Sequence, residues 1–488
     1  MSRNKVLAID AGSSSIRGTI VDSELSVVEA WSVPLIASTP APNFVEYSGE
    51  AIAAALVEIL SRATASCRDI SAIAISNQRA TTALWDAQTG KVLGPVLSWM
   101  DLRTAAMCLG LASSGISIAP NQSATKVAFL ATIATGSAPE QMRFGTLDSY
   151  LLWLLTEGQS HATDHTNAAM TGFVQDTSVR WDPKVTDILS LPRTILPEIL
   201  PSASYFGEYR AQATIPILGM IGDQQGSMLG QGCLAIGDTK ITFGTGTILD
   251  QNAGRVAPRE VTRGASGMIP IVAYSDQTAL TWAREGIALA SGSMINWLLS
   301  MKVLPDIARA NQIDSSFRSG SSLYVIPANV GLGTPEWDFG ARSLMVGLSL
   351  STTATDIVAA TLDAIAQIAA DLVEAAQADT GVEINTLGVD GGMTANDPFL
   401  HLVADALGIP IVVAPNRESA TIGAALLAHG QLGGYRAIGE DGLTIPAGRR
   451  VAPRIERGSA LWQSRREAWK EAKALSLASL PEFSAVKF

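Results

Sequence analysis

The chain has 488 residues, of which 47% are hydrophobic and 16% charged, and its formal net charge is −11. This length predicts two or three domains. The acidic balance, with no cluster of Lys and Arg to offset it, argues against a nucleic-acid partner. No run reaches the roughly 18 apolar residues that a spanning helix needs, and the N-terminus lacks a signal-peptide pattern. We therefore expect a soluble, cytoplasmic protein with no membrane partner.

The first 100 residues are predicted to form a sheet with a helix packed on it, because apolar runs and alternating segments surround one segment of helical spacing. The predicted strands lie at 6–9, 16–21, 70–76, 82–86 and 92–98, with a helix at 50–65. The following region, 104–211, is predicted to be helical with loops. Such an order is typical of a mixed α/β fold.

The same order of elements restarts near the middle of the chain. The predicted elements are a strand at 215–221, a helix at 224–229, strands at 239–243 and 249–252, a helix at 355–378, a strand at 386–389 and a helix that begins near 396–398. The halves share a pattern and not their residues, which indicates a duplicated topology. Since the break falls near 226–232, we expect domains at 1–228 and 229–488.

A last amphipathic helix is predicted at 461–475. Its inward residues are expected to be Leu461, Ala468, Trp469, Ala472 and Leu475, and its solvated residues Arg465, Arg466, Glu467, Lys470 and Glu471.

Two similar turns, one in each half, are candidates for phosphate binding. Asp10 ends an apolar strand and is followed by Ala11, Gly12, Ser13 and Ser14. Residues 243–247, with Gly244 and Thr245, follow the strand at 239–243. Backbone N–H and side-chain O–H groups in such turns face phosphate oxygens. The pair predicts a nucleotide held between two domains.

Two carboxylates at strand ends have chemical and structural interpretations that remain open. Asp10 could hold a hydrated Mg²⁺ beside substrate phosphates, or close an Asx turn. Arg17 could be a second phosphate ligand or a cation on the sheet surface. Asp223 could take the proton from an attacking hydroxyl, or cap the helix at 224–229, and both roles are compatible.

Other polar and aromatic side chains follow predicted strands and suit a polyhydroxylated ligand. They are Asn77, Gln78, Arg79, Trp99, Asp101 and Arg103. The turn Asp390-Gly391-Gly392 would let a purine or ribose approach the backbone closely, although a simple turn is the more common meaning. His161 and His165 have the spacing of a zinc pair, but their neighbours favour a turn and we expect no metal there. The three widely spaced cysteines predict neither a disulfide framework nor a metal site.

Taken in order, these motifs resemble the FGGY carbohydrate kinases, and most closely the glycerol kinase branch. The resemblance covers nearly the whole chain. The segments that carry it are 9–17, 76–82, 98–101, 145–153, 161–168, 222–225, 243–247, 285–286, 331–338 and 390–396.

The resemblance implies a pair of ribonuclease-H-like domains of the actin/Hsp70 type, with ATP, Mg²⁺ and a small polyol or sugar in a central cleft. It implies that Asp223 is the catalytic base and that Asp10 lies by the metal. The residues implied at the nucleotide are Ser14, Arg17, Thr245, Gly292, Asn296, Gly392 and Asn396. Those implied at the polyol are Arg79, Trp99, Asp223 and Gln224.

Two positions depart from the glycerol kinase pattern. Glycerol kinases carry a Glu directly after the Arg of the substrate motif, where this chain has Ala80. They carry a Tyr four residues before a Thr-Lys pair, where this chain has Asn121. Each loss would leave a glycerol hydroxyl unpaired, at a cost of about 1–3 kcal/mol. We therefore expect a larger polyol or a sugar, bound partly through Asp101 or Asn121.

The alternatives are a glycerol kinase proper, an actin/Hsp70-type ATPase that regulates a protein partner, and a family member whose substrate site has decayed. The sequence is compatible with a homo-oligomer and does not decide the oligomeric state.

Overall fold

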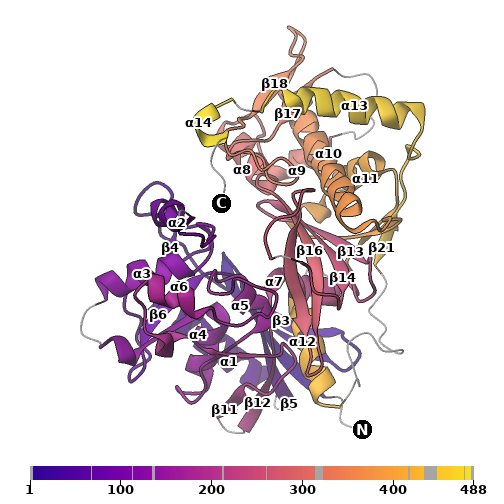
Figure 1. Cartoon of the computed structure of the whole chain (residues 1–488). Coiled ribbons are helices and arrows are strands. Elements are labelled where there is room, and N and C mark those ends of the chain that lie inside the picture. Colours follow the sequence, from indigo (N-terminus) through magenta and orange to yellow (C-terminus); the bar gives the residue numbers. More distant parts are fainter. Residues whose placement is uncertain are drawn as a thin grey trace.

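The chain folds into two α/β halves. In Figure 1 the N-terminal half is indigo to magenta and the C-terminal half is pink to yellow. The computed structural model describes residues 4–67, 69–112, 114–134, 138–210, 214–259, 261–313, 322–415, 418–433, 448–477 and 479–484.

The N-terminal half is built on a six-stranded sheet in the order β11-β12-β5-β1-β2-β3. Its strands are β1 (Lys5–Ala11), β2 (Ser15–Asp22), β3 (Val27–Pro34), β5 (Ile70–Asn77), β11 (Gly207–Arg210) and β12 (Thr214–Gly222). Strands β1, β5 and β12 are parallel to one another, whereas β2, β3 and β11 pair antiparallel with their neighbours. The parallel strands are almost entirely apolar because helices cover both faces.

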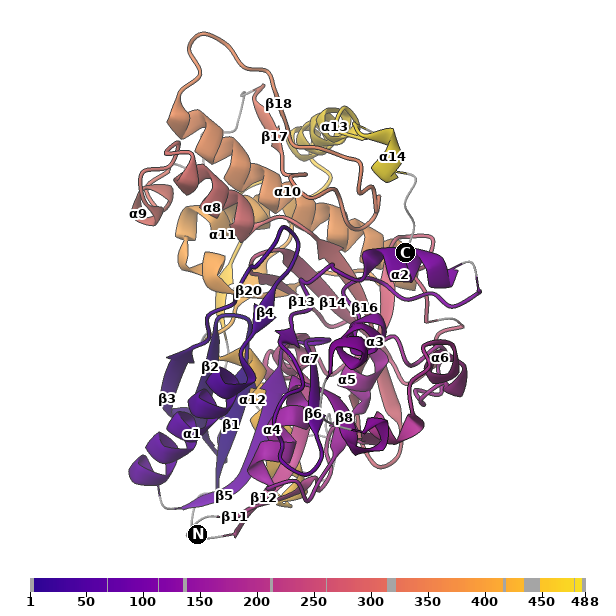
Figure 2. The same ribbon diagram turned by 90° about the vertical axis from the view of Figure 1, so that its left-hand side faces the viewer.

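Alternation along β1 assigns each face of this sheet to a helix. Leu7 and Ile9 belong to the core formed with α1 (Gly49–Ser66), and Val6 and Ala8 to the core formed with α12 (Ser419–Gln431). Both helices can be followed in Figure 2. Helix α12 is therefore C-terminal in sequence but covers a face of the N-terminal sheet.

The C-terminal half contains a seven-stranded sheet in the order β15-β16-β14-β13-β19-β20-β21. Its strands are β13 (Thr239–Phe243), β14 (Thr247–Gly254), β15 (Ile269–Ser275), β16 (Leu280–Ala288), β19 (Leu387–Asp390), β20 (Ile411–Val413) and β21 (Arg449–Val451). The order β16-β14-β13-β19-β20 repeats the directions of β3-β2-β1-β5-β12, with two antiparallel and then two parallel pairings. The duplicated topology predicted from the sequence is confirmed.

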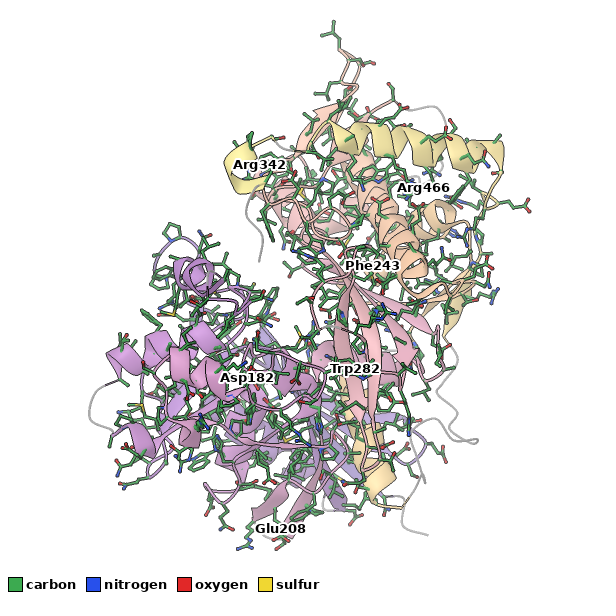
Figure 3. The ribbon with its side chains drawn as sticks, viewed as in Figure 1. Asp182, Glu208, Phe243, Trp282, Arg342 and Arg466 are labelled. Atoms are coloured by element: carbon green, nitrogen blue, oxygen red, sulfur yellow. The ribbon has the colours of Figure 1, made fainter. Side chains whose placement is uncertain are left out.

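One face of the second sheet is apolar and the other is partly charged. Ile241 and Phe243 pack into the core of α10 (Ala354–Thr380) and α11 (Asp397–Leu407), where the Phe243 ring lies 5.0 Å from that of Phe399 (Figure 3). Lys240 and Thr242 alternate with them and so face the other side, toward the N-terminal half. Helix α10 starts at a capping box of Thr353 and Asp356.

Helices α7 (Asp223–Gly230) and α12 pack against each other between the two sheets. Glycine makes this possible, because a Cβ on Gly423 would lie 1.9 Å from the carbonyl oxygen of Gly226. The division expected between residues 228 and 229 falls inside α7, and it stays a prediction. The halves also meet where Trp282 of β16, labelled in Figure 3, packs near Ala168 and Val272.

The remaining elements are shorter. The helices are α2 (Ala105–Ala112), α3 (Ala124–Ile133), α4 (Leu147–Leu155), α5 (His165–Ala169), α6 (Pro183–Ile188), α8 (Gly292–Ser300), α9 (Ile307–Ala310), α13 (Ala460–Ala474) and α14 (Pro481–Ser484). The strands are β4 (Glu46–Tyr47), β6 (Thr82–Asp86), β7 (Val96–Leu97), β8 (Met142–Thr146), β9 (Ala162–Asp164), β10 (Glu198–Leu200), β17 (Tyr324–Ile326) and β18 (Leu344–Val346). Of the predicted strand at 92–98 only β7 forms, because Pro95 lacks an N–H and Gly94 has a φ of 152°.

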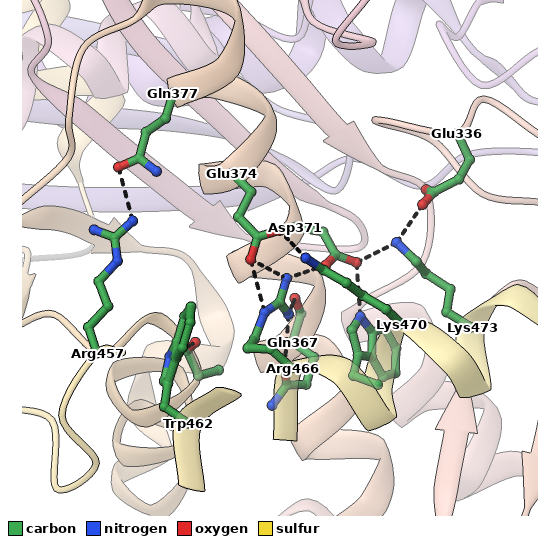
Figure 4. Close-up of polar contacts among 12 residues, drawn as sticks. Glu336, Gln367, Asp371, Glu374, Gln377, Arg457, Trp462, Arg466, Lys470 and Lys473 are labelled. Atoms are coloured by element: carbon green, nitrogen blue, oxygen red, sulfur yellow. Dashed lines mark hydrogen bonds and ion pairs between the residues drawn. The ribbon is translucent and has the colours of Figure 1, made fainter. Parts of the chain in front are cut away.

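The last predicted helix is present as α13, but its predicted faces are partly wrong. Leu461 and Leu475 are exposed, whereas Arg466 is only 3% exposed. The Arg466 Nη2 lies 2.5 Å from an Asp371 oxygen and 2.9 Å from a Glu374 oxygen (Figure 4). Lys473 also reaches Asp371, at 2.7 Å. Arg466 was therefore predicted to face solvent, whereas it pairs with the buried Asp371 and the partly exposed Glu374 of α10.

Two further expectations concern membranes and cysteines. Among the described residues, no helix has the length and apolar character needed to cross a bilayer. Cys67, Cys108 and Cys233 are all buried and free of disulfide bonds.

Candidate active site

Three neighbouring parallel strands of the first sheet end at the same edge. In the pairing register Ala11 lies opposite Asn77, and Asn77 lies opposite Gly222. The residues around these ends are Asp10, Arg79 and Asp223. Carboxyl ends of parallel strands are where α/β folds collect ligand-binding groups, and here the topology brings together residues that are far apart in the sequence.

Asp223 is the first residue of α7, directly after the N-cap residue Gly222. Its Oδ1 accepts the N–H of Gln224 at 2.8 Å. Burial raises the pKa of Asp223, and the nearby guanidinium of Arg79 opposes that shift. Arg79 comes this close because residue 222 is glycine, since a Cβ there would lie 2.8 Å from the Arg79 Cγ. A carboxylate with a raised pKa at this position is suited to accept a proton.

Asp10 is the penultimate residue of β1, near Asp223, and is only 8% exposed. Burial and the charge of Asp223 raise the pKa of Asp10 to about 7, whereas Arg17, its cross-strand partner, lowers it. The buried Oδ1 of Asp10 has no hydrogen-bond partner among the described residues. Such an oxygen fits a hydrated Mg²⁺, which uses one or two carboxylates beside phosphates. Within the described residues, no group of three or more His, Cys, Asp or Glu side chains is arranged to hold a metal ion by itself, at Asp10 or at any other place.

The first candidate phosphate turn connects β1 to β2. The Gly12 N–H donates to the Ser15 carbonyl at 3.0 Å, and the Gly12 carbonyl accepts from Gln78 Nε2 at 3.1 Å. Ser13 and Ser14 are exposed at its tip. These two hydrogen bonds fix the backbone of the turn, and the hydroxyl groups of Ser13 and Ser14 remain accessible.

The second candidate turn connects β13 to β14 and is joined to the start of α8. The N–H of Gly292 donates to the carbonyl of Gly244 at 3.0 Å, and the N–H of Ser293 donates to that of Thr245 at 3.1 Å. A Cβ on Gly292 would lie 2.6 Å from the Gly244 oxygen, so glycine is required there. Thr245 and Asn296 are exposed. The structure thus brings together three residues implied at the nucleotide, Thr245, Gly292 and Asn296.

The turn after β19 lies at the same edge, since Thr242 pairs with Asp390. Gly391 has a φ of 96° and sits against the Phe243 carbonyl, while Gly392 is exposed with open space around it. Asn396 differs from the other nucleotide candidates. Its side chain caps α11 by accepting from Phe399 N–H and also donates to the Ala310 carbonyl, and it is 7% exposed. Its amide is therefore occupied by structural contacts.

A separate group of side chains lies beside Arg79. Trp99 is 38% exposed, and its backbone N–H donates to Thr81 Oγ1 at 3.2 Å. The buried Lys126 Nζ donates to the carbonyls of Ser98 at 2.7 Å and Asn121 at 3.1 Å. Lys126 therefore ties the Trp99 loop to the Asn121 loop.

The two departures from the glycerol kinase pattern are also joined in space. Ser123 Oγ, two residues after Asn121, donates to the carbonyl of Ala80 at 3.2 Å. The small residues that replace Glu and Tyr therefore lie on adjoining segments.

The substrate contact predicted for Asp101 is not supported. Its side chain is fully buried. One oxygen accepts the Val45 N–H at 2.7 Å, and both accept from Arg103, which lies over the Phe44 ring. The chain turns inward after Trp99, so that Asp101 and Arg103 form a buried ion pair and do not line a ligand site.

The histidine pair is structural. His161 contacts the Phe144 carbonyl at 2.8 Å and the edges of Trp85 and Trp153, whereas His165 begins α5 and contacts Ser275 Oγ at 3.0 Å. The placement of His165 in a turn was wrong. The two rings have different partners.

Three buried charged residues of the second sheet were missed as parts of the site. Lys240, Asp250 and Glu285 are fully buried and follow one another across β13, β14 and β16. The Lys240 Nζ lies 2.8 Å from Asp250 Oδ2, and Arg79 Nη2 lies 2.6 Å from Glu285 Oε2. Burial raises the pKa of Glu285 to about 7, against the lowering effect of Arg79. A lysine within a strand predicted to be buried, at 239–243, was the available signal.

Comparison with known proteins gives consistent matches along the chain. Residues 5–230 match the N-terminal domain of the FGGY family of carbohydrate kinases, and residues 240–431 match its C-terminal domain. Glycerol kinase from Escherichia coli O8 (strain IAI1) is 32% identical, covering 97% of this chain and 98% of the relative. Glycerol kinase from Shewanella piezotolerans is 33% identical, covering 97% and 99%.

Solved structures show the same relationship. Plasmodium falciparum glycerol kinase with ADP superposes with a TM-score of 0.85 at 26% identity, covering 100% of this chain and 99% of that one. Xylulose kinase from Lactobacillus acidophilus has a TM-score of 0.85 at 20% identity, covering 99% and 100%. The latter likeness shows the fold alone.

Proposed function

Because the chain belongs to the FGGY family of carbohydrate kinases, in its glycerol kinase-like branch, we propose that it transfers the terminal phosphoryl group of ATP to a hydroxyl of a polyol or sugar larger than glycerol. The observation that carries the proposal is the position of Asp223 at the start of α7, where Asp10 and Arg79 both lie near it. In the proposal, the base Asp223 therefore acts next to the candidate metal ligand Asp10.

In this mechanism Asp223 accepts the proton of the attacking hydroxyl while Arg79, Trp99, Asn121 and Gln224 orient the acceptor. Burial supports the first role, since it raises the pKa of Asp223 and so increases its affinity for a proton. Gly12, Ser13, Ser14, Arg17, Gly244, Thr245, Gly292, Asn296 and Gly392 are the candidates for the nucleotide. Bound Mg²⁺ would neutralise phosphate charge, and the Asp10 carboxylate would hold it.

The size of the acceptor is inferred from Ala80 and Asn121. Both stand where glycerol kinases have larger side chains, and Ser123 links their segments. Less side-chain volume leaves room for a longer carbon chain, and the absent carboxylate and phenol would leave glycerol hydroxyls unpaired. The alternative is a glycerol kinase proper, the name carried by the relatives. An actin/Hsp70-type ATPase has no support from the relatives, which are named as kinases.

The test is an acceptor screen read by ADP release, with glycerol, erythritol, xylitol, D-xylulose and D-gluconate at several concentrations. We expect slow ATP turnover alone and a higher kcat/KM for at least one four- to six-carbon acceptor than for glycerol. A preference for glycerol would favour the alternative, and turnover that no acceptor accelerates would contradict the proposal.

A further inference from the structure

Lys240 connects the C-terminal sheet to the candidate acceptor site. It is fully buried, and its Nζ donates to Gln224 Oε1 at 2.7 Å and to Thr242 Oγ1 at 2.8 Å. Its third neighbour is Asp250 Oδ2, at 2.8 Å. Lys240 and Asp250 are cross-strand partners on β13 and β14, so the sheet itself sets the position of the ammonium group.

This contact determines which way the Gln224 amide points. An ammonium group has only donors, and a primary amide has an acceptor oxygen on one side and two N–H donors on the other. Since Lys240 contacts the oxygen, the Gln224 Nε2 must face away from it. No partner of that Nε2 is present among the described residues, and Gln224 is half-buried next to Asp223.

We propose that Lys240 is a positioning residue that reaches across the two halves and makes Gln224 an obligatory hydrogen-bond donor to the acceptor substrate. The inference rests on the proposed function, because it concerns the same acceptor site. The Gln224 amide then recognises an oxygen lone pair, whereas the Asp223 carboxylate accepts a proton. A hydroxyl between the two residues accepts from Gln224 and donates to Asp223, and a carbon without an oxygen at that point is rejected.

Asp250 compensates the buried positive charge of Lys240. An isolated buried ammonium would be strongly unfavourable, and removing one member of a buried pair leaves the other uncompensated. The pair also suits a test, because Lys240 lowers the pKa of Asp223 whereas Asp250 raises it. When both charges are removed, the two resulting changes in the pKa of Asp223 have opposite signs. A change in the acceptor KM then reports on the orientation of the Gln224 amide.

The principal variant is the double substitution Lys240→Met/Asp250→Leu, assayed with the five acceptors named above. We expect the KM for the acceptor to rise about tenfold, the equivalent of roughly one hydrogen bond. The KM for ATP should stay within about twofold, and the pH profile of kcat should not move. An unchanged acceptor KM, or an equal rise in both KM values, would overturn the proposal.

Two more variants separate orientation from general damage. Gln224→Glu keeps an oxygen for Lys240 but presents an acceptor to the substrate, so the acceptor KM should again rise about tenfold. A normal KM in this variant would show that Gln224 does not donate. Lys473→Met is the matched control, because it removes another buried ammonium group. Lys473 lies near the C-terminal end of α13 and forms an ion pair with Asp371. This control variant should lower Tm and leave the acceptor KM unchanged.

Failure of the proposed function can be distinguished from failure of this inference. If the natural enzyme phosphorylates none of the five acceptors, the proposed function fails, and the contact is then judged by melting temperature. The Tm change caused by Gln224→Glu should be more favourable with Lys240 present than in the Lys240→Met/Asp250→Leu background, because the new carboxylate gains an ion pair. Equal changes in both backgrounds would overturn the contact.

Discussion

Asp10 and Asp223 lie more than 200 residues apart in the sequence, yet the fold brings them near enough for the charge of Asp223 to act on the buried carboxyl group of Asp10. Burial and the charge of Asp223 together raise the pKa of Asp10 to about 7. Two like charges in a buried place disfavour ionisation of one of them. A bound cation held by the Asp10 carboxylate would remove this cost, because it would neutralise part of the negative charge.

Binding of Mg²⁺ with a nucleotide should stabilise the protein more at pH 8 than at pH 6. The pKa of Asp10 is near 4 in the unfolded chain and about 7 in the fold. At pH values between about 4 and 7 the folded state therefore holds a proton that the unfolded state has lost. Stability of the folded protein falls as the pH rises from the lower to the higher of these two pKa values. Melting curves with MgCl₂ and a non-hydrolysable ATP analogue at the two pH values measure the difference. Asp10→Asn should abolish it, and a difference that persists in that variant would argue against Asp10 as the metal ligand.

Asp223→Asn should lower kcat by about 10²–10⁴-fold, the usual contribution of a general base. The substitution keeps the size and the N-terminal position in α7, so nucleotide affinity should be retained. Steady-state phosphorylation gives kcat, and calorimetric titration with ADP is the control. Near-normal turnover would remove Asp223 from the catalytic role.

Ala80→Glu should shift acceptor preference toward glycerol. Ala80 already has a φ of 58° and is 2% exposed, so a larger residue adds volume and a carboxylate without a new backbone requirement. We expect the ratio of kcat/KM for glycerol to that for xylitol to rise at least about tenfold, which corresponds to about 1.4 kcal/mol. Ala80→Gly is the control for backbone effects. An unaltered ratio would mean that residue 80 does not limit acceptor size.

Arg466→Met should lower the free energy of unfolding by about 1.5–3 kcal/mol, because it removes charge-assisted hydrogen bonds to the buried Asp371, which then keeps only Lys473 and Trp469 as partners. Arg466 also donates to Gln367, and Trp469 donates to Asp371 at 2.9 Å (Figure 4). Lys470→Met is the matched control. Lys470 is on the same helix, pairs with the same Glu374 at 2.8 Å and is exposed, so its removal should cost less than about 1 kcal/mol. Equal losses in chemical denaturation would contradict the assigned burial.

Much of the site could be predicted from local pattern. Asp10, Thr245 and Asp223 each lie at or just after the end of a strand predicted to be buried, and strand ends with tight turns leave few alternatives for the backbone. The faces of α13 could not be predicted in this way, because helical spacing does not reveal that carboxylates of α10 receive Arg466. Asp101 failed for a related reason, since its position after Trp99 did not show that the chain turns inward to Arg103.

The sequence by itself determined the order of the strands and turns, the duplicated topology and the family, because these depend on apolar periodicity and on motifs read along the chain. The tertiary structure alone decided which charges meet. Lys240 reaches Gln224, and Arg79 reaches Glu285, only when the two sheets face each other across α7 and α12. Buried electrostatic contacts depend on distances between segments that are remote in sequence, and no local pattern encodes those distances.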